Sequence, residues 1–355
     1  MKLTTEDIAN EAGVSRATVS RVLNGHGGVR HETVIRINKA MDRLGYVRPA
    51  LRPGPRPRNM TPQQQSLKSV GLVLLGGAGG MFTEPTMAYL IEDLQRVCRA
   101  RRINLVLEQT SDPHELPHCV GSGQVEGVIL MPFGLAVGAQ RDALRLLSAR
   151  IPCVHVFGPS HPFPLMDHVT VNDVAVGALA YKELVERGCD SFVLVDGSNC
   201  FHEAQVVRGR AFLDRCLLAK HPSAVISASH TEFAKEGLWP GNVHVMDSHE
   251  AAVRVCAKLK SKGAVGYFFS LDKDAGAFYR ALSEAGLFDD GRGEMVVAGV
   301  TPAYVDSLQP RPILVDTCLG EVLEGALSRL VVRIGQMNER SVTTLIAPRV
   351  LDESD

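Results

Sequence analysis

Residues 13–24 read GVSRATVSRVLN, and this stretch predicts the turn between two short helices together with the second helix. Gly13 tolerates the positive φ that ends a helix, and Ser15 has the kind of side chain that caps the amino end of the next one. A helix is therefore predicted over residues 16–23, closed by a turn that begins at Asn24. Val14 in the turn and Val19 and Val22 in the helix are expected to face inward and hold the two helices together.

The sequence on either side adds one helix at each end. Thr4 is predicted to cap the first, because Asp7 three positions later completes a capping-box pattern. A third helix is predicted over residues 31–44. Three short helices in this order predict a helix-turn-helix DNA-binding domain over residues 1–48. The inner faces of the first and third helices are expected to be Ile8, Ala9 and Ala12, and Val34, Ile37, Ala40, Met41 and Leu44.

In such a domain the first residues of the second helix reach base edges in the major groove. Arg16 can donate two hydrogen bonds to guanine, and Ala17 can contact a thymine methyl group. Short polar side chains are suited to bind phosphates and set the register, and those available here are Ser15, Thr18, Ser20 and Asn24. Without these roles, the same helices would be a plain three-helix bundle with solvated arginines.

The charge of the chain is unevenly distributed. The first 58 residues hold eleven Lys and Arg against five Asp and Glu, whereas the whole chain has a net charge of -1. A basic head on an acidic body indicates that the head meets a polyanion. Residues 49–68 are rich in proline and arginine and predict an extended basic linker, in which Leu51 and Arg52 are candidates for contact with the minor groove.

From residue 69 to 355 the sequence alternates short apolar strands with amphipathic helices. This rhythm predicts an α/β fold of parallel sheets covered by helices, and its length favours two doubly wound lobes. We expect the first lobe to comprise about 69–167 and 299–328, and the second about 168–298 and 329–350. The strands are expected at 70–75, 103–107, 127–130, 154–157, 169–171, 192–195 and 295–297, and helices at 89–101, 174–187, 207–219, 251–261 and 275–285.

Several other classes of protein are disfavoured. No apolar run is long enough to span a membrane, and eight scattered cysteines without a Cys-x-x-Cys pair indicate a reducing, cytoplasmic location. Residues 114–118 (HELPH) match a zinc-binding string, but Pro117 interrupts the helix that zinc requires, and a helix beginning at Pro113 is the preferred interpretation. Residues 76–80 (GGAGG) lack the third glycine of a dinucleotide loop. Neither a cofactor, a metal nor an enzymatic activity is expected.

Residues 4–49 resemble the headpiece of the lac repressor family (LacI/GalR), most specifically in the stretch quoted first. The resemblance implies that Arg16 and Ala17 are the variable base-reading positions and that Arg21 also enters the groove. It assigns the DNA backbone to Thr4, Ser15, Thr18 and Asn24, and implies a homodimer on a near-palindromic operator. The sequence PALRPGP at residues 49–55 departs from the hinge helix that is usual in the family, since its prolines oppose a continuous helix.

The body resembles the same family more weakly, in the segments 82–107, 167–188 and 268–287. This implies a two-lobed sensor, similar to periplasmic binding proteins, that holds a small-molecule effector between its lobes. Two departures cast doubt on an ordinary hexose: Gln205 stands where the family has an arginine, with Arg208 one turn later, and AGVTP at residues 298–302 replaces a Gly-x-Asp-Asp element. The implied effector-binding residues are Phe82, Asp173, Gln205, Arg208 and Asp272.

The sequence thus predicts a dimeric transcription regulator, a repressor by preference, controlled by a sugar-like or other small metabolite. A ligand-dependent activator stays open as an alternative. A DNA-binding head fused to a small-molecule enzyme and a purely architectural DNA binder are the rivals from other classes.

Overall fold

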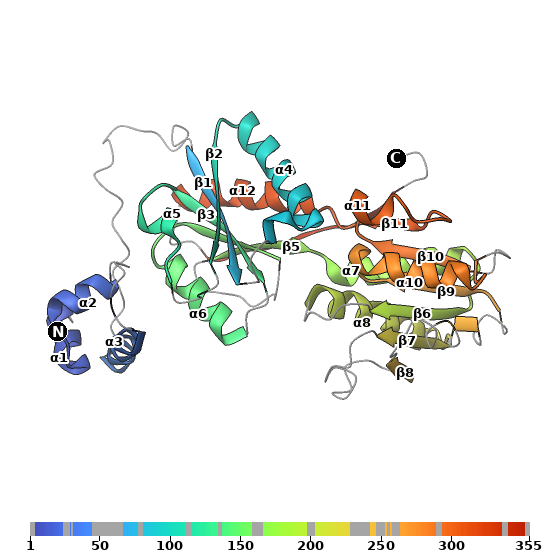
Figure 1. Cartoon of the computed structure of the whole chain (residues 1–355), viewed down its shortest axis with the longest axis horizontal. Helices are drawn as coiled ribbons and strands as arrows, with labels where there is room; N and C mark the ends of the chain where they lie inside the picture. The colour runs from blue at the N-terminus through green and yellow to red at the C-terminus, as the bar shows by residue number, and fades with distance from the viewer. Residues whose placement is uncertain are drawn as a thin grey trace.

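A computed structural model of the chain has a small helical head and two α/β lobes that lie side by side (Figure 1). It describes residues 4–23, 29, 31–44, 67–76, 81–110, 112, 115–133, 137–157, 166–196, 203–227, 242–245, 253, 256, 257, 263–288, 293–335 and 340–351.

The head consists of three helices. The sequence predicted the bounds of the second and third helices, and the structure confirms them. The three helices are α1 (Thr5–Ala12), α2 (Arg16–Leu23) and α3 (His31–Leu44). Thr4 and Asp7 form the predicted capping box, and Gly13 ends α1 with a φ of 61°. Apolar residues of all three helices form one small core, which contains Ile8, Ala9, Ala12, Val19, Ile37, Ala40 and Met41.

The first lobe is built on a six-stranded sheet in the order β12-β5-β4-β3-β1-β2, with every pairing parallel. Helices α4 and α12 contribute to the apolar core on one face, and α6 to the core on the other. The strands are β1 (Ser69–Gly76), β2 (Asn104–Thr110), β3 (Gly127–Phe133), β4 (Cys153–Val156), β5 (Asp167–Val171) and β12 (Thr343–Ile346). The helices are α4 (Pro85–Ala100), α5 (His118–Gly121), α6 (Val137–Ser148) and α12 (Leu319–Gly335), with a 3-10 turn at Met81–Thr83.

The second lobe has a seven-stranded sheet in the order β13-β11-β10-β9-β6-β7-β8, parallel except for β13. Helices α7 and α8 pack together on one face, and α10 lies on the other. The strands are β6 (Ser191–Asp196), β7 (Ser223–Ser227), β8 (Asn242–Val245), β9 (Val265–Phe269), β10 (Gly293–Ala298), β11 (Ile313–Asp316) and β13 (Arg349–Val350). The helices are α7 (Asp173–Glu186), α8 (Glu203–Leu218), α10 (Asp272–Glu284) and α11 (Pro302–Val305).

The chain passes between the lobes after β5, after β11 and after β12, which differs from the expected boundaries. The prediction gave 299–328 to the first lobe and 329–350 to the second. In the structure β11 pairs with β10 in the second lobe, whereas α12 packs on β4 and β5 and β12 pairs with β5 in the first. β5 also belongs to the first lobe in full. The prediction was wrong here because apolar spacing locates a strand without saying which sheet it joins.

Helix starts also differ from those predicted. Most helices begin one to four residues before the expected position, because their first turns carry polar or proline residues that apolar periodicity does not count. Near the zinc-like string, the expected helix at Pro113 is absent over the described residues 115–117, and α5 begins at His118. Most of the expected helix at 251–261 lies outside the described residues. No helix in the ranges given above is long and apolar enough to cross a membrane.

Candidate functional site

The amino end of α2 is formed as the sequence predicted. The backbone N–H of Thr18 donates to Ser15 Oγ over 3.1 Å, and the two hydroxyls lie 2.8 Å apart. This cap leaves Arg16 and Ala17 exposed at the start of the helix, where a helix-turn-helix meets DNA bases. The Arg16 guanidinium lies 3.7 Å from the Glu6 carboxylate of α1, and its side chain is 70% exposed. Such a surface pair contributes at most about 1 kcal/mol, so Arg16 can leave it for a base.

A hollow of about 370 Å³ lies beside α2 and carries several of the expected phosphate-contacting groups. Its lining includes Val14, Ser15, Thr18, Arg21, Val29, Thr33 and Arg36. Arg36 and Thr33 of α3 were not among the predicted DNA-contacting residues; they lie where α3 borders this hollow, beside the apolar face of that helix. Thr4 caps α1 and Ser20 is exposed on α2. Asn24, Leu51 and Arg52 lie outside the described residues.

Three of the five expected effector-binding side chains come together in the second lobe. Arg208 of α8 donates through Nε to Asp173 Oδ1 over 2.7 Å and through Nη1 to the Ser270 carbonyl over 3.0 Å. Asp272 is close enough for the charge of Arg208 to act on its carboxyl. Asp173 and Asp272 begin α7 and α10, and Ser270 directly follows β9, which is the position at which open parallel sheets bind ligands; Arg208 reaches them from within α8.

Two backbone N–H groups hold the carboxylate of Asp272, one from the segment that follows β10 and one from α10 itself. Its Oδ2 accepts a hydrogen bond from the Thr301 N–H over 3.0 Å, and its Oδ1 accepts one from the Lys273 N–H over 2.8 Å. Gly299 has a φ of +122°, and a Cβ there would lie 2.5 Å from Asp272 Cγ. The glycine in AGVTP therefore makes room for the Asp272 carboxylate.

Both carboxylates are shifted toward the neutral form. Burial raises the pKa of Asp173 above the ordinary carboxyl range, and Arg208 offsets only part of this. Burial likewise raises the pKa of Asp272, against the hydrogen bonds from Thr301 and Lys273. Buried carboxylates with raised pKa values beside a buried arginine are typical of functional sites.

The other two predicted residues are Gln205 in the second lobe and Phe82 in the first. Gln205 is buried on α8, one turn before Arg208. Phe82 lies in the 3-10 turn of the first lobe, where its half-buried ring packs against the apolar core.

Among the described residues, two hydrogen bonds join the lobes beside the cluster, and sequence reasoning missed all four residues that form them. The hydroxyl of Tyr304 in α11 donates to Glu84 Oε1 over 2.5 Å, and the Thr86 and Thr301 hydroxyls lie 3.3 Å apart. Glu84 also caps α4 through the Met87 N–H. Glu84-Pro85 and Thr301-Pro302 are both helix starts that follow a strand, a pattern that could have indicated loops at the carboxyl edges of the sheets.

Comparison with known proteins places this geometry in context. Residues 4–49 match the model of the family described as bacterial regulatory proteins, lacI family. Catabolite control protein A of Staphylococcus aureus is 25% identical over 293 residues, which cover 81% of this chain and 79% of that protein.

Solved structures share the whole fold at lower identity. The transcriptional regulator CelR in complex with cellobiose has a TM-score of 0.59 and 20% identity, and the alignment covers 99% of this chain and 98% of CelR. The lac repressor dimer bound to operator and the anti-inducer ONPF has a TM-score of 0.58 and 16% identity, over 99% of this chain and 98% of the repressor. The head, the two lobes and their order along the chain are thus common to all three proteins.

Proposed function

Because the chain belongs to the lacI family of bacterial regulatory proteins, which bind DNA and regulate transcription, we propose that it is a dimeric repressor controlled by a small effector. Two heads read a near-palindromic operator, and the effector binds between the two lobes. The protein acts in the cytoplasm, where its DNA is, and has no enzymatic activity of its own.

The observation that carries the proposal is the capped start of α2 within the segment that matches the family. Ser15 caps the helix and Arg16 and Ala17 stand exposed at its tip, so that the tip can enter a major groove with its first side chains at the base edges. Arg21 lines the neighbouring hollow with Ser15 and Thr18, which suits contact with the sugar-phosphate backbone.

The effector is proposed to be sugar-like and to bind beside the Asp173, Arg208 and Asp272 cluster. Carboxylates accept hydrogen bonds from hydroxyl groups and a guanidinium donates to them, and Gln205 does both. Solved relatives support this class of ligand, since CelR was solved with cellobiose and a regulator from Enterococcus faecium with ribose. Arg208 also holds Asp173 in place, since its Nε donates to Asp173 and its Nη1 to the Ser270 carbonyl.

Regulation follows from the position of the interlobe bonds. An effector that binds both lobes changes the angle between them. The new angle either breaks or strengthens the Glu84–Tyr304 hydrogen bond. In a dimer this motion changes the distance between the two heads, and a dimer reads the half-site spacing. Effector and operator must then alter each other's affinity by the same factor, typically about 1–3 kcal/mol.

The DNA-binding part is tested by selecting operators from random duplex DNA with the full-length protein. Enrichment of a near-palindrome supports the proposal, and its half-sites give the operator. The same selection with Arg16→Ala should lose preference at one base pair of each half-site. Arg43→Ala serves as the control. It removes an exposed arginine near the carboxyl end of α3 that pairs with Glu11 of α1, and it should select the same operator as the wild-type protein. An unenriched pool with the wild-type protein, both without and with the candidate sugars, contradicts the proposal.

The effector part is tested with the selected operator. Mono- and disaccharides that raise the thermal midpoint of the protein are titrated into the operator complex, and the change in operator affinity is compared with the reciprocal change in sugar affinity. Equal factors support the mechanism. A sugar that binds tightly and leaves operator affinity unchanged contradicts it.

A further inference from the structure

The amino ends of the first-lobe strands form a single edge, because every strand pairing in that sheet is parallel. We call this the amino edge, and define it by the residues that directly precede each strand and by the last turns of the helices that lead to them. Five exposed cations lie along it, from one side of the sheet to the other: Lys68 before β1, Arg99 and Arg102 before β2, Arg145 before β4, and Arg340 before β12.

These cations have no acidic partner among the described residues, in contrast to the arginine beside them. Arg101 binds Glu324 over 2.9 Å and Ser328 over 3.2 Å. Of the described residues that directly precede the strands, Glu126 is the one acid, and its carboxylate accepts a hydrogen bond from the Lys68 backbone N–H over 2.6 Å. The amino edge therefore has an excess of exposed positive charge.

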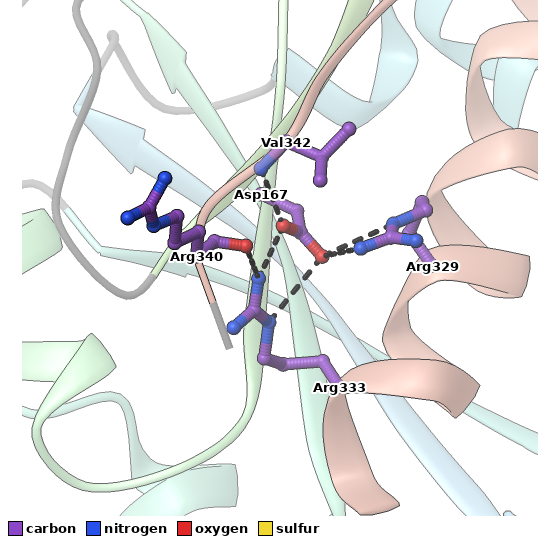
Figure 2. A network of polar contacts seen from close by, with 5 residues as sticks. All are labelled: Asp167, Arg329, Arg333, Arg340 and Val342. Atoms are coloured by element: carbon purple, nitrogen blue, oxygen red, sulfur yellow. Dashed lines mark hydrogen bonds and ion pairs between the residues drawn. The ribbon is translucent and has the colours of Figure 1, made fainter. Parts of the chain in front are cut away.

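A buried network under the edge adds to this excess (Figure 2). Asp167, the first residue of β5, binds both Arg329 and Arg333, so one carboxylate faces two guanidinium groups. Arg333 also donates to the Arg340 carbonyl over 3.3 Å, which fixes the backbone at the start of β12. The side chain of Arg340 points away from Asp167 in Figure 2 and stays available at the surface.

The position of this charge is as informative as its amount. Residues 59–355 hold 27 Lys and Arg against 34 Asp and Glu, so exposed cations gather at the amino edge of a body that is acidic as a whole. Leu67 and Lys68 precede β1, so the segment that leads to the head joins the sensor at this same edge. The edge is thus the part of the sensor that is nearest along the chain to bound DNA.

We propose that the amino edge is a second DNA-binding surface, which contacts phosphates of the duplex next to the half-site held by the head. The cations precede four of the six strands, including β12 and β2 at the two ends of the sheet, so at about 4.8 Å per strand they spread over roughly 24 Å, or about seven base pairs of duplex. The contact is with the backbone alone, so it adds affinity without reading sequence. This inference rests on the proposed function, because it needs a head that brings DNA to the sensor.

The test compares two full-length triple variants by fluorescence anisotropy on the selected operator and on a scrambled duplex of equal length. Arg99→Gln/Arg102→Gln/Arg340→Gln removes charge from the amino edge. Arg215→Gln/Arg280→Gln/Arg311→Gln removes three exposed arginines from the second lobe as the matched control. Affinity is measured from about 50 to 200 mM KCl, where each lost phosphate contact reduces the slope of log K against log salt by about 0.9.

The edge variant should lose about 10-fold or more in affinity at the lowest salt, by the same factor on both duplexes, and its salt slope should fall by about 2 to 3. The control should match the wild type. Equal slopes and affinities for the two variants overturn the proposal. So does a change in oligomeric state with an unchanged DNA slope, which would assign the edge to an acidic protein surface. Failure of the proposed function would give a different result: the wild-type protein itself would bind the selected operator no more tightly than the scrambled duplex.

Discussion

Tyr304 of the second lobe donates a hydrogen bond to Glu84 of the first lobe, Oη to Oε1, at a distance of 2.5 Å. Because Glu84 also caps α4, this contact couples the α11 turn directly to a long helix of the other lobe. The neighbouring Thr86–Thr301 pair continues through the Thr301 N–H to Asp272. A carboxylate of the proposed effector site thus hydrogen-bonds directly to a residue of the lobe interface.

Tyr304→Phe should loosen the arrangement of the two lobes. A hydrogen bond to a charged group contributes about 1.5–3 kcal/mol, and the variant loses it without leaving a cavity. Small-angle X-ray scattering of the ligand-free protein should therefore show a larger radius of gyration. Tyr181→Phe, which removes a tyrosine hydrogen bond to His221 within the second lobe, is the control and should scatter like the wild type. An unchanged radius of gyration for Tyr304→Phe would show that the contact does not hold the lobes.

Two glycine substitutions should act in opposite directions. Gly299→Ala places a Cβ against Asp272 at a φ of +122°, so it should cost about 1–3 kcal/mol of stability and displace the carboxylate. Gly276→Ala, in α10 with open space around it, should stabilise by about 0.5–1 kcal/mol. Urea denaturation measures both. Loss of effector response in Gly299→Ala alone would link Asp272 to the effector, whereas an equal response in both variants would count against that role.

Asp167→Asn should be strongly destabilising. Arg333 is 2% exposed, and the substitution leaves its guanidinium buried without a countercharge, which costs about 3–5 kcal/mol. Asp214→Asn makes the same chemical change at an exposed pair with Arg210, where about 0.5 kcal/mol or less is expected. If both variants lose a similarly small amount of unfolding free energy relative to the wild type, the network in Figure 2 contributes little to stability.

The stability of the sensor should fall on mild acidification because of His155. His155 and His168 stack on adjacent strands with ring centroids 4.6 Å apart, and burial, followed by the neighbouring His168, lowers the pKa of His155 to about 3. The neutral imidazole favours folding above its unfolded pKa of 6.5, and this contribution is lost as the pH falls toward 3. Between pH 7.5 and 5.5 the wild type should lose about 1.4 kcal/mol more than His155→Gln. Parallel pH profiles of the two proteins would contradict this.

Arg16→Ala should relax discrimination at one base pair of each half-site by about 1–3 kcal/mol. Operators with single base-pair changes, measured by fluorescence anisotropy at fixed salt, give the discrimination directly. The Arg16–Glu6 pair is exposed, so removing it should change the free energy of unfolding by less than about 1 kcal/mol. A uniform loss over all operators would instead assign Arg16 to the phosphates.

Local rules were sufficient for the head. The cap at Ser15, the capping box of Thr4 and Asp7, and the end of α1 at Gly13 each depend on residues within one turn of one another. The second and third helices of the head therefore have the bounds that the sequence predicts. The alternation of strands and helices in the body was readable in outline: the seven expected strands correspond to β1–β6 and β10, whereas β7–β9 and β11–β13 were not among the expected ranges.

The tertiary structure decided how these elements combine. Tyr304 and Glu84 are 220 positions apart, and Asp167 and Arg333 are 166 apart, so no local pattern in the sequence relates them. The sheet that β11 or β12 joins depends on which neighbours bury its apolar face, and several strands of equal hydrophobicity compete for each place. The amino edge likewise exists only because six segments spread over residues 69–346 align in parallel, which brings cations far apart in the chain onto one surface. Helix capping and apolar periodicity depend on residues a few positions apart, so many of the elements could be predicted. Strand pairing and the burial of apolar faces select among segments that are distant in the sequence, so the assembly of these elements could not be predicted.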